Sequence, residues 1–302
     1  MATPLRTWHK RVLQANVVAQ AGIVVTGALV RLTASGLGCP TWPECVDGSI
    51  TPTSTQTEAW HKYIEFGNRM LTTVLVVVAL ASILAIRQHN KDRVTAGLAR
   101  RPLLFKLALA CFGGIFAQAI LGGITVLTGL NPLTVAAHFL VSIGLIAVAV
   151  VLLWRAQESS DVRDLNISKI AHRGIRALVG LALTVITIGT LVTGTGPHAG
   201  DTSEITRLPF DPRVISWIHA DVVLLFMGLL VGLLVTLHAL NAPTLLKRAG
   251  AITLAVGLGQ GLIGYVQYFT SLPWVLVAFH VAGACLLWIT SVRFLLSTRS
   301  AQ

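Results

Sequence analysis

The segments that decide the fold read QAILGGITVLTGLNPLTVAAH over residues 118–138 and QGLIGYVQYFTSLPWVLVAFH over residues 260–280. In each segment a glutamine precedes a histidine by twenty residues, and the residues beginning at each glutamine also match, as QAILG against QGLIG. Intramembrane histidines are costly to bury and usually mark a function. The pattern therefore predicts a duplicated unit that carries His138 and His280 into a membrane, with two sites for a planar, axially ligated cofactor.

The composition indicates an integral membrane protein. Of the 302 residues, 54% are hydrophobic and only 12% are charged, whereas a soluble domain carries about 25% charged residues. Apolar runs extend toward the roughly 20 residues that a helix needs to cross a bilayer. The sequence therefore predicts an all-α integral membrane protein with eight transmembrane helices, over residues 12–33, 63–86, 104–127, 133–154, 175–194, 214–239, 249–269 and 273–296.

The chain has a net charge of +11, and its basic residues are divided unequally between the two predicted sides of the membrane. If the N-terminus is inside, 18 of the 23 lysine and arginine residues fall on the cytoplasmic side. This asymmetry follows the positive-inside rule and predicts an N-in, C-in topology. The positive charge is thus topological, which argues against nucleic acid and makes anionic membrane lipid the expected partner. The first apolar stretch shows no convincing cleavage site, so we expect it to be retained as a helix.

The chain is predicted to consist of two four-helix bundles. Residues 1–154 form the N-terminal half, residues 155–174 a polar cytoplasmic linker, and residues 175–302 the C-terminal half. Each half has an even number of helices, so both halves enter the membrane from the same side. The repeat is therefore predicted to be parallel, related by an axis along the membrane normal.

Three histidines lie at similar predicted depth in the outer half of the membrane. His138, His219 and His280 stand five to eight residues into their helices, about 8–12 Å deep at the α-helical rise. Alignment of the two halves places Asn68 opposite His219. Two imidazoles on neighbouring helices can face each other across a haem iron. A lone buried histidine could instead bond a neighbouring helix, but three at matched depth favour cofactor ligation.

The remaining histidines carry weaker signals. His9, His89, His172 and His238 fall at or near the cytoplasmic side and are predicted to be interfacial. A zinc site would need more ligands clustered nearby than the sequence offers at these depths.

A carboxylate distinguishes the first half. Glu65 lies three residues before Asn68, so both project from nearly the same helix face. Glu65 could act as a general base, or it could form a salt bridge with Arg69. The first half, with His138 and no clear second imidazole, is therefore predicted to hold the substrate. The second half is predicted to serve electron transfer or structural support.

Arginines and cysteines mark the outer ends of the helices. Arg31, Arg69 and Arg213 could pair with haem propionates, or could anchor the interface by snorkelling. Cys39 and Cys45 lie in the first outer loop, within CPTWPEC, and face an oxidising compartment. A disulfide is favoured there over a free or metal-binding thiol pair. Packing roles are expected for the two cysteines inside helices, Cys111 and Cys285.

Three motifs resemble those of haem A synthase, a family of bacterial haem O-oxidising membrane enzymes. The stretch GALVRLTASGLGCPTWPEC over residues 27–45 resembles its helix 1 and first-loop signature. The stretch IEFGNR over residues 64–69 resembles its Glu-x-x-His-Arg motif, and TGPHAGD over residues 195–201 resembles its second outer-loop motif. The resemblance covers essentially the whole chain.

The resemblance implies a reaction. Family members oxidise the C8 methyl of haem O to a formyl group by successive hydroxylations, giving haem A for cytochrome c oxidase. The implied location is the bacterial cell membrane. The implied partners are haem O as substrate, haem O synthase, an electron acceptor, membrane lipid and a second copy of the chain in a homo-oligomer.

The resemblance also implies site residues. Haem b would be the cofactor, held axially by His219 and His280. The substrate haem would lie at His138, with Asn68, Arg69 and Arg31 around it and Glu65 as the catalytic carboxylate. Cys39 and Cys45 would form the loop disulfide.

One residue departs from the family pattern. Asn68 stands where the family motif has a histidine, and an amide is a poor iron ligand beside imidazole. Either the substrate iron has one protein ligand, or another group, such as His61 two helical turns away, supplies the second. The second outer loop also lacks a cysteine pair. Competing hypotheses are a di-haem electron carrier of cytochrome b type and a haem transporter or chaperone; Glu65 and the unequal ligand sets favour the enzyme.

Overall fold

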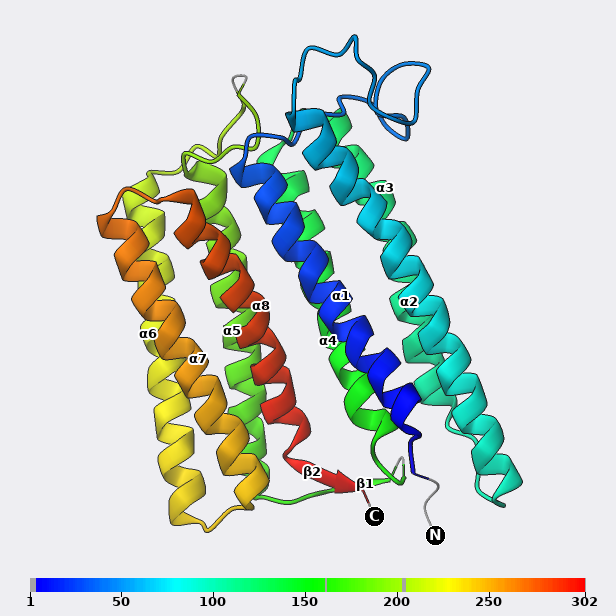
Figure 1. The fold of residues 1–302 in the computed structure, drawn as a ribbon. Coiled ribbons are helices and arrows are strands. Elements are labelled where there is room, and N and C mark those ends of the chain that lie inside the picture. The colour runs from blue at the N-terminus through cyan, green and yellow to red at the C-terminus, as the bar shows by residue number, and fades with distance from the viewer. Residues whose placement is uncertain (1–3, 161, 203–204, 302) are drawn as a thin grey trace.

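The computed structural model describes residues 4–160, 162–202 and 205–301, and these residues are almost entirely helical (Figure 1). Long helices run through the length of the molecule, and two short strands lie at the end that carries both termini. The elements are α1 Thr7–Leu32, α2 His61–Thr95, α3 Pro102–Leu127, α4 Pro132–Ala156, β1 Arg163–Leu165, α5 Lys169–Thr195, α6 Pro212–Ala239, α7 Thr244–Phe269, α8 Trp274–Leu296 and β2 Arg299–Ala301.

The helices suit a hydrocarbon environment. Eight helices among the described residues are long and apolar enough to cross a membrane. Large apolar side chains point outward along them: Leu224 is 62% exposed and Leu262 is 67% exposed. A water-soluble monomer rarely exposes extended apolar surface of this kind. The prediction of eight long apolar helices in an all-α chain is confirmed.

Several helices extend beyond their predicted ends. α2 continues past Ile86 to Thr95, through a polar segment. α5 begins at Lys169 rather than 175, because the Ser168 hydroxyl accepts a hydrogen bond from the Ala171 N–H at 3.2 Å and caps the first turn. Hydropathy marks the apolar part of a helix, whereas caps and polar turns set its ends. The predicted boundaries were wrong at these positions for that reason.

The helices assemble as two groups of four (Figure 1). In each group the first helix contacts the second and fourth, and the third contacts the second and fourth, so that α1–α4 and α5–α8 each form a closed ring. The groups meet through α1, α4, α5 and α8. A buried hydrogen bond joins them, because the Trp288 indole N–H donates to the Ile143 carbonyl at 2.8 Å.

The segment between the two groups contains a strand that the sequence did not predict. β1 pairs antiparallel with β2, with Asp164 opposite Ser300 and Leu165 opposite Arg299. The pairing ties the connecting segment to the end of α8. A three-residue strand has too few residues to show hydrophobic alternation, so the pattern that predicts strands is absent from it.

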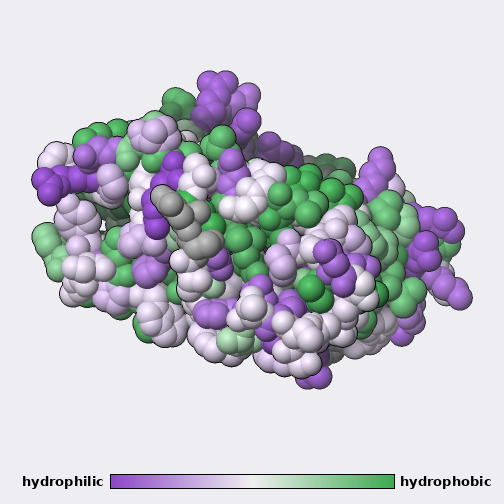
Figure 2. All heavy atoms as spheres, turned by 90° about the horizontal axis from the view of Figure 1, so that it is seen from above, coloured by the Kyte–Doolittle hydropathy of each residue, from purple (hydrophilic) through white to green (hydrophobic). Residues whose placement is uncertain are grey.

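The two ends of the molecule differ. Both termini and the β1–β2 pair lie at one end, and the long loop 33–60 lies at the other end with the described part of 196–211 (Figure 1). Figure 2 looks onto the loop end and shows patches of hydrophilic residues among hydrophobic ones. The predicted disulfide between Cys39 and Cys45 is present in loop 33–60. The loop end also holds the residues predicted to form the functional site.

Candidate functional site

Each predicted ligand position lies against a glycine of the preceding helix. A Cβ atom built on that glycine would stand within van der Waals reach of the ring or amide, at 3.3 Å from His138 and His219, 3.5 Å from His280 and 3.9 Å from Asn68. Small residues let helices approach closely in a membrane. The four contacts are Gly27 with Asn68, Gly122 with His138, Gly189 with His219 and Gly264 with His280. The sequence showed these glycines as matching residues of the repeat. Only the structure shows that each one packs against the side chain at a predicted ligand position.

His219 of α6 and His280 of α8 face each other. Their ring centroids are 6.5 Å apart and the ring planes are inclined by 70°. With metal–imidazole bonds of about 2.0–2.1 Å, two imidazoles on one metal ion would have centroids roughly 6–6.5 Å apart. Both rings are half-buried, and the buried Nδ1 of each lacks a hydrogen-bond partner among the described residues. The pair therefore fits axial ligation of one iron.

His138 of α4 is held by the glutamine of the repeat. The Gln118 side-chain amide donates to the His138 carbonyl at 3.0 Å and also to the Ser142 hydroxyl. Gln118 thus fixes the backbone of the helix that presents the imidazole, and it does not bond the ring. His138 is half-buried and its Nδ1 has no partner in the described parts of the chain. The ring is therefore free to act as a ligand.

Asn68 occupies the fourth position of this pattern. Its amide faces Gly27, and its buried Oδ1 accepts no hydrogen bond from any described residue. His61, the alternative donor, is already engaged: its Nδ1 lies 2.9 Å from the Ser35 hydroxyl and its ring stacks on Trp60 at 4.0 Å. The N-terminal group therefore presents one imidazole and one amide where the C-terminal group presents two imidazoles.

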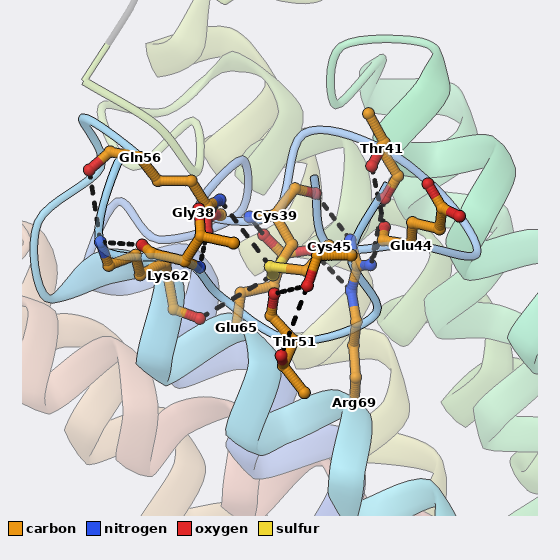
Figure 3. The surroundings of a disulfide bond; sticks show 12 residues. Gly38, Cys39, Thr41, Glu44, Cys45, Thr51, Gln56, Lys62, Glu65 and Arg69 are labelled. Carbon is orange, nitrogen blue, oxygen red and sulfur yellow. Dashed lines mark hydrogen bonds and ion pairs between the residues drawn. A yellow bond between two sulfur atoms is a disulfide. The ribbon is translucent and has the colours of Figure 1, made fainter. Parts of the chain in front are cut away.

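Glu65 and Arg69 tie the disulfide loop to α2 (Figure 3). Glu65 is only 5% exposed; its Oε1 lies 2.6 Å from Arg69 Nη2, and its Oε2 accepts the Cys39 N–H at 2.7 Å. The Arg69 guanidinium also donates to the carbonyls of Cys39, Thr41 and Glu44. The salt bridge considered from the sequence is therefore present. The carboxylate lies on the helix turn that precedes Asn68, at the junction of the loop and α2.

Arg31 connects the two helix groups at the loop end. Its Nη2 donates to the Thr193 carbonyl of α5 at 2.7 Å, and its buried Nε has no partner among the described residues. Next to it the Gly36 N–H donates to the Gly200 carbonyl at 2.7 Å, which joins loop 33–60 to the described part of 196–211. Arg213, by contrast, is exposed at the start of α6.

Two of the histidines predicted to be interfacial lie at the opposite end and are buried within the protein. His9 is 0% exposed and His89 is 2% exposed, and their ring centroids are 6.2 Å apart. They lie on the facing surfaces of α1 and α2. Both side chains are therefore shielded from solvent even though they lie near the ends of their helices. None of their four ring nitrogens has a partner in the described residues. His172 and His238 are hydrogen-bonded, to the Thr298 hydroxyl and the Leu234 carbonyl.

Comparison with known proteins identifies relatives over most of the chain. The sequence model of the COX15-CtaA family, described as cytochrome oxidase assembly protein, matches residues 10–292. The protein named Heme A synthase from Bacillus mycoides is 23% identical over 92% of this chain and 89% of its own length. Heme A synthase from Geobacillus kaustophilus is 31% identical over 38% of this chain, an alignment that spans about a third (32%) of that relative.

We predict that Glu65→Ala loosens the disulfide loop. The change leaves the Cys39 N–H without its acceptor and the Arg69 guanidinium without its counter-ion, which should cost about 2–3 kcal/mol of local stability. Hydrogen–deuterium exchange of the peptide that contains residues 38–45 measures this. Asp47→Ala, an exposed carboxylate in the same loop, is the control and should leave exchange unchanged. Equal exchange in wild type and Glu65→Ala would show that the carboxylate does not hold the loop.

Proposed function

The chain belongs to the COX15-CtaA family of cytochrome oxidase assembly proteins, and we propose that within this family it acts as a haem A synthase. The proposed reaction oxidises the C8 methyl group of haem O to the formyl group of haem A. Two successive hydroxylations of the same carbon, each a two-electron oxidation whose electrons pass to the proposed electron acceptor, give a hydrate, which loses water to form the aldehyde. The observation that carries the proposal is the facing His219–His280 pair in a chain whose relatives are named Heme A synthase.

The cofactor assigned to the C-terminal group is haem b. His219 and His280 would hold its iron, because the spacing of their rings suits two axial ligands and their ring surfaces are partly open. Gly189 and Gly264 keep each imidazole against the neighbouring helix, which limits the orientations of the ring. A haem bound there supplies one-electron redox chemistry.

The substrate site is assigned to the N-terminal group. His138 would bind the iron of haem O, with Asn68 on the facing side as a polar neighbour rather than a second strong ligand. One imidazole ligand holds the substrate less firmly than two, as release of a product requires. Arg31 and Arg69 lie at the loop end of this group and offer guanidinium donors suited to the propionates of the substrate.

Glu65 is the carboxylate nearest to this substrate position along α2. Its proposed role is to accept a proton during oxidation of the methyl group. Arg69 pairs with the Glu65 carboxylate, which fixes the orientation of the carboxylate. The same ion pair holds the disulfide loop, so the structural and the catalytic roles of Glu65 are compatible.

The proposed setting is the bacterial cell membrane, with the termini inside. Both termini lie at one end of the molecule (Figure 1), and 18 of the 23 basic residues are assigned to that side. This is the distribution expected of a cytoplasmic face. The two helix groups would be parallel repeats of one unit. Haem O synthase as supplier of the substrate, an electron acceptor and a second copy of the chain complete the proposed partners.

The decisive test is pigment analysis of host membranes that contain haem O and lack haem A. Expression of this chain should produce haem A or its hydroxylated precursor in the extracted pigments, detected by mass spectrometry. An electron carrier or a haem transporter would leave haem O unchanged. Recovery of haem O alone, with the protein present in the membrane, would refute the enzymatic function.

We predict that His219→Ala and His280→Ala each remove the low-spin haem b signal. Each substitution deletes one of the two axial imidazoles, so the remaining iron loses its strong-field ligand pair. The absorbance spectrum of the purified protein, reduced minus oxidised, measures the effect. His238→Ala, on the same helix as His219 but bonded to the Leu234 carbonyl, should keep the signal. A low-spin spectrum in both ligand variants would contradict the assignment of His219 and His280 as ligands of haem b.

We predict that Glu65→Gln lowers turnover by a factor of about 10²–10⁴, the usual contribution of a general base. Glutamine retains one acceptor oxygen, which can serve the Cys39 N–H, so the loop should loosen less than in Glu65→Ala while the proton acceptor is lost. Haem A formation in host membranes measures turnover, and hydrogen exchange of the loop checks the fold. Glu58→Gln, in the same loop, is the control. Turnover equal to wild type would leave Glu65 with a structural role alone.

A further inference from the structure

A pocket opens at the end of the molecule that carries the termini. It lies between the β1–β2 pair, the first turns of α5 and the last turn of α8, and it encloses about 250 Å³. Its lining residues are Arg163, His172, Arg176, Leu295, Leu296 and Arg299. Three of these six are arginines and two are leucines, so the lining combines cationic and apolar side chains.

Hydrogen bonds fix the walls of this pocket. The β1–β2 ladder places Arg299 opposite Leu165, and the Asn166 N–H donates to the Thr298 carbonyl at 2.9 Å. The His172 Nδ1 lies 2.9 Å from the Thr298 hydroxyl. Arg163 Nη2 donates to the Leu296 carbonyl at 2.7 Å. The segment between the helix groups and the end of the chain therefore hold the pocket open together.

The positive charge of the pocket is only partly balanced. Glu158 is shared, because it pairs with Arg163 at 2.9 Å and with Arg155 at 3.2 Å. No described carboxylate forms an ion pair with Arg176 or Arg299. Asp164 is not on the pocket side, because alternate residues of a strand point to opposite faces and Arg163 lines the pocket. An anion in the pocket would supply the missing negative charge.

Arg163 itself lacks a partner for one donor. Its side chain is only 10% exposed, yet its Nε has no hydrogen-bond acceptor among the described residues. Burial, together with the charges of Arg155 and Arg299, lowers the pKa of the Arg163 guanidinium, and Glu158 offsets this only in part. A buried donor without a partner is costly. The Nε group thus marks a place for an acceptor oxygen.

We propose that this pocket binds the phosphate group of an anionic phospholipid. Guanidinium groups recognise phosphate oxygens through paired hydrogen bonds. The two leucines offer an apolar surface to the glycerol and acyl part, which a free phosphate ion would leave unused. The pocket lies where α8 ends at Leu296 and α5 begins at Lys169, so in the proposed membrane setting it would lie at the depth of lipid headgroups. Basic pockets at the cytoplasmic ends of membrane helices bind anionic headgroups in this way.

The binding test uses the full-length protein in detergent and native mass spectrometry. The probes are phosphatidylglycerol, phosphatidylcholine with matched acyl chains, and inorganic phosphate. The test variant is Arg176→Gln combined with Arg299→Gln, because both side chains are exposed and both line the pocket. Arg163 is left intact because it bonds the end of α8. The control is Arg173→Gln combined with Arg248→Gln, which removes the same charge from exposed positions outside the pocket lining.

We predict that wild type prefers phosphatidylglycerol over phosphatidylcholine and that the test variant loses at least about tenfold in affinity for phosphatidylglycerol. The control should stay within about twofold of wild type, since diffuse surface charge is worth little per residue. Equal losses in test and control variants would overturn the site, as would unchanged binding in the test variant. Occupation by inorganic phosphate without preference for the lipid would overturn the lipid as the ligand. Thermal unfolding of each variant without lipid confirms that the fold is retained.

Discussion

The contact between a glycine and a polar side chain on the next helix governs the geometry of both helix groups. In α3/α4, α5/α6 and α7/α8 the glycine meets an imidazole, and in α1/α2 it meets the amide of Asn68. A polar imidazole inside a membrane is costly, so it usually has a hydrogen-bond partner or serves a function. The glycine brings the helix backbone close to one side of the ring and leaves another part of the ring surface open. Each helix pair thereby holds one polar side chain against a glycine.

The duplicated scaffold carries unequal chemistry because the loop end differs between the groups. The C-terminal group presents His219 and His280 at a spacing that fits one iron. The N-terminal group has a single imidazole, and its α2 also carries a buried ion pair. Glu65 and Arg69 form hydrogen bonds with the disulfide loop. The same two side chains therefore hold the loop and supply charged groups at the proposed site. Stability of the loop and reactivity beneath it are therefore coupled.

Periodic and compositional signals predicted much of the fold, and contacts between distant segments account for what they missed. Eight apolar stretches predicted eight helices, and the repeat of glutamine and histidine identified the rings that face glycines. The β1–β2 pair was missed because three residues carry no usable alternation, and it forms only when the chain end meets the central segment. From the sequence, Glu65 could be either a general base or a salt-bridge partner. The structure adds a hydrogen bond from the Cys39 N–H to Glu65. Cys39 lies in a loop whose path no local sequence pattern predicts, so this contact could not be foreseen.

Ring spacing alone does not identify a haem site, as the two histidine pairs of this protein show. His9 and His89 have centroids 6.2 Å apart, close to the 6.5 Å of His219 and His280. The first pair, however, is 0% and 2% exposed, so surrounding side chains occupy the space that a planar macrocycle would need. Of these two described pairs, only His219 and His280, which lie against glycines, leave part of the side-chain surface open. This openness, more than the distance, supports the proposed iron site at the loop end.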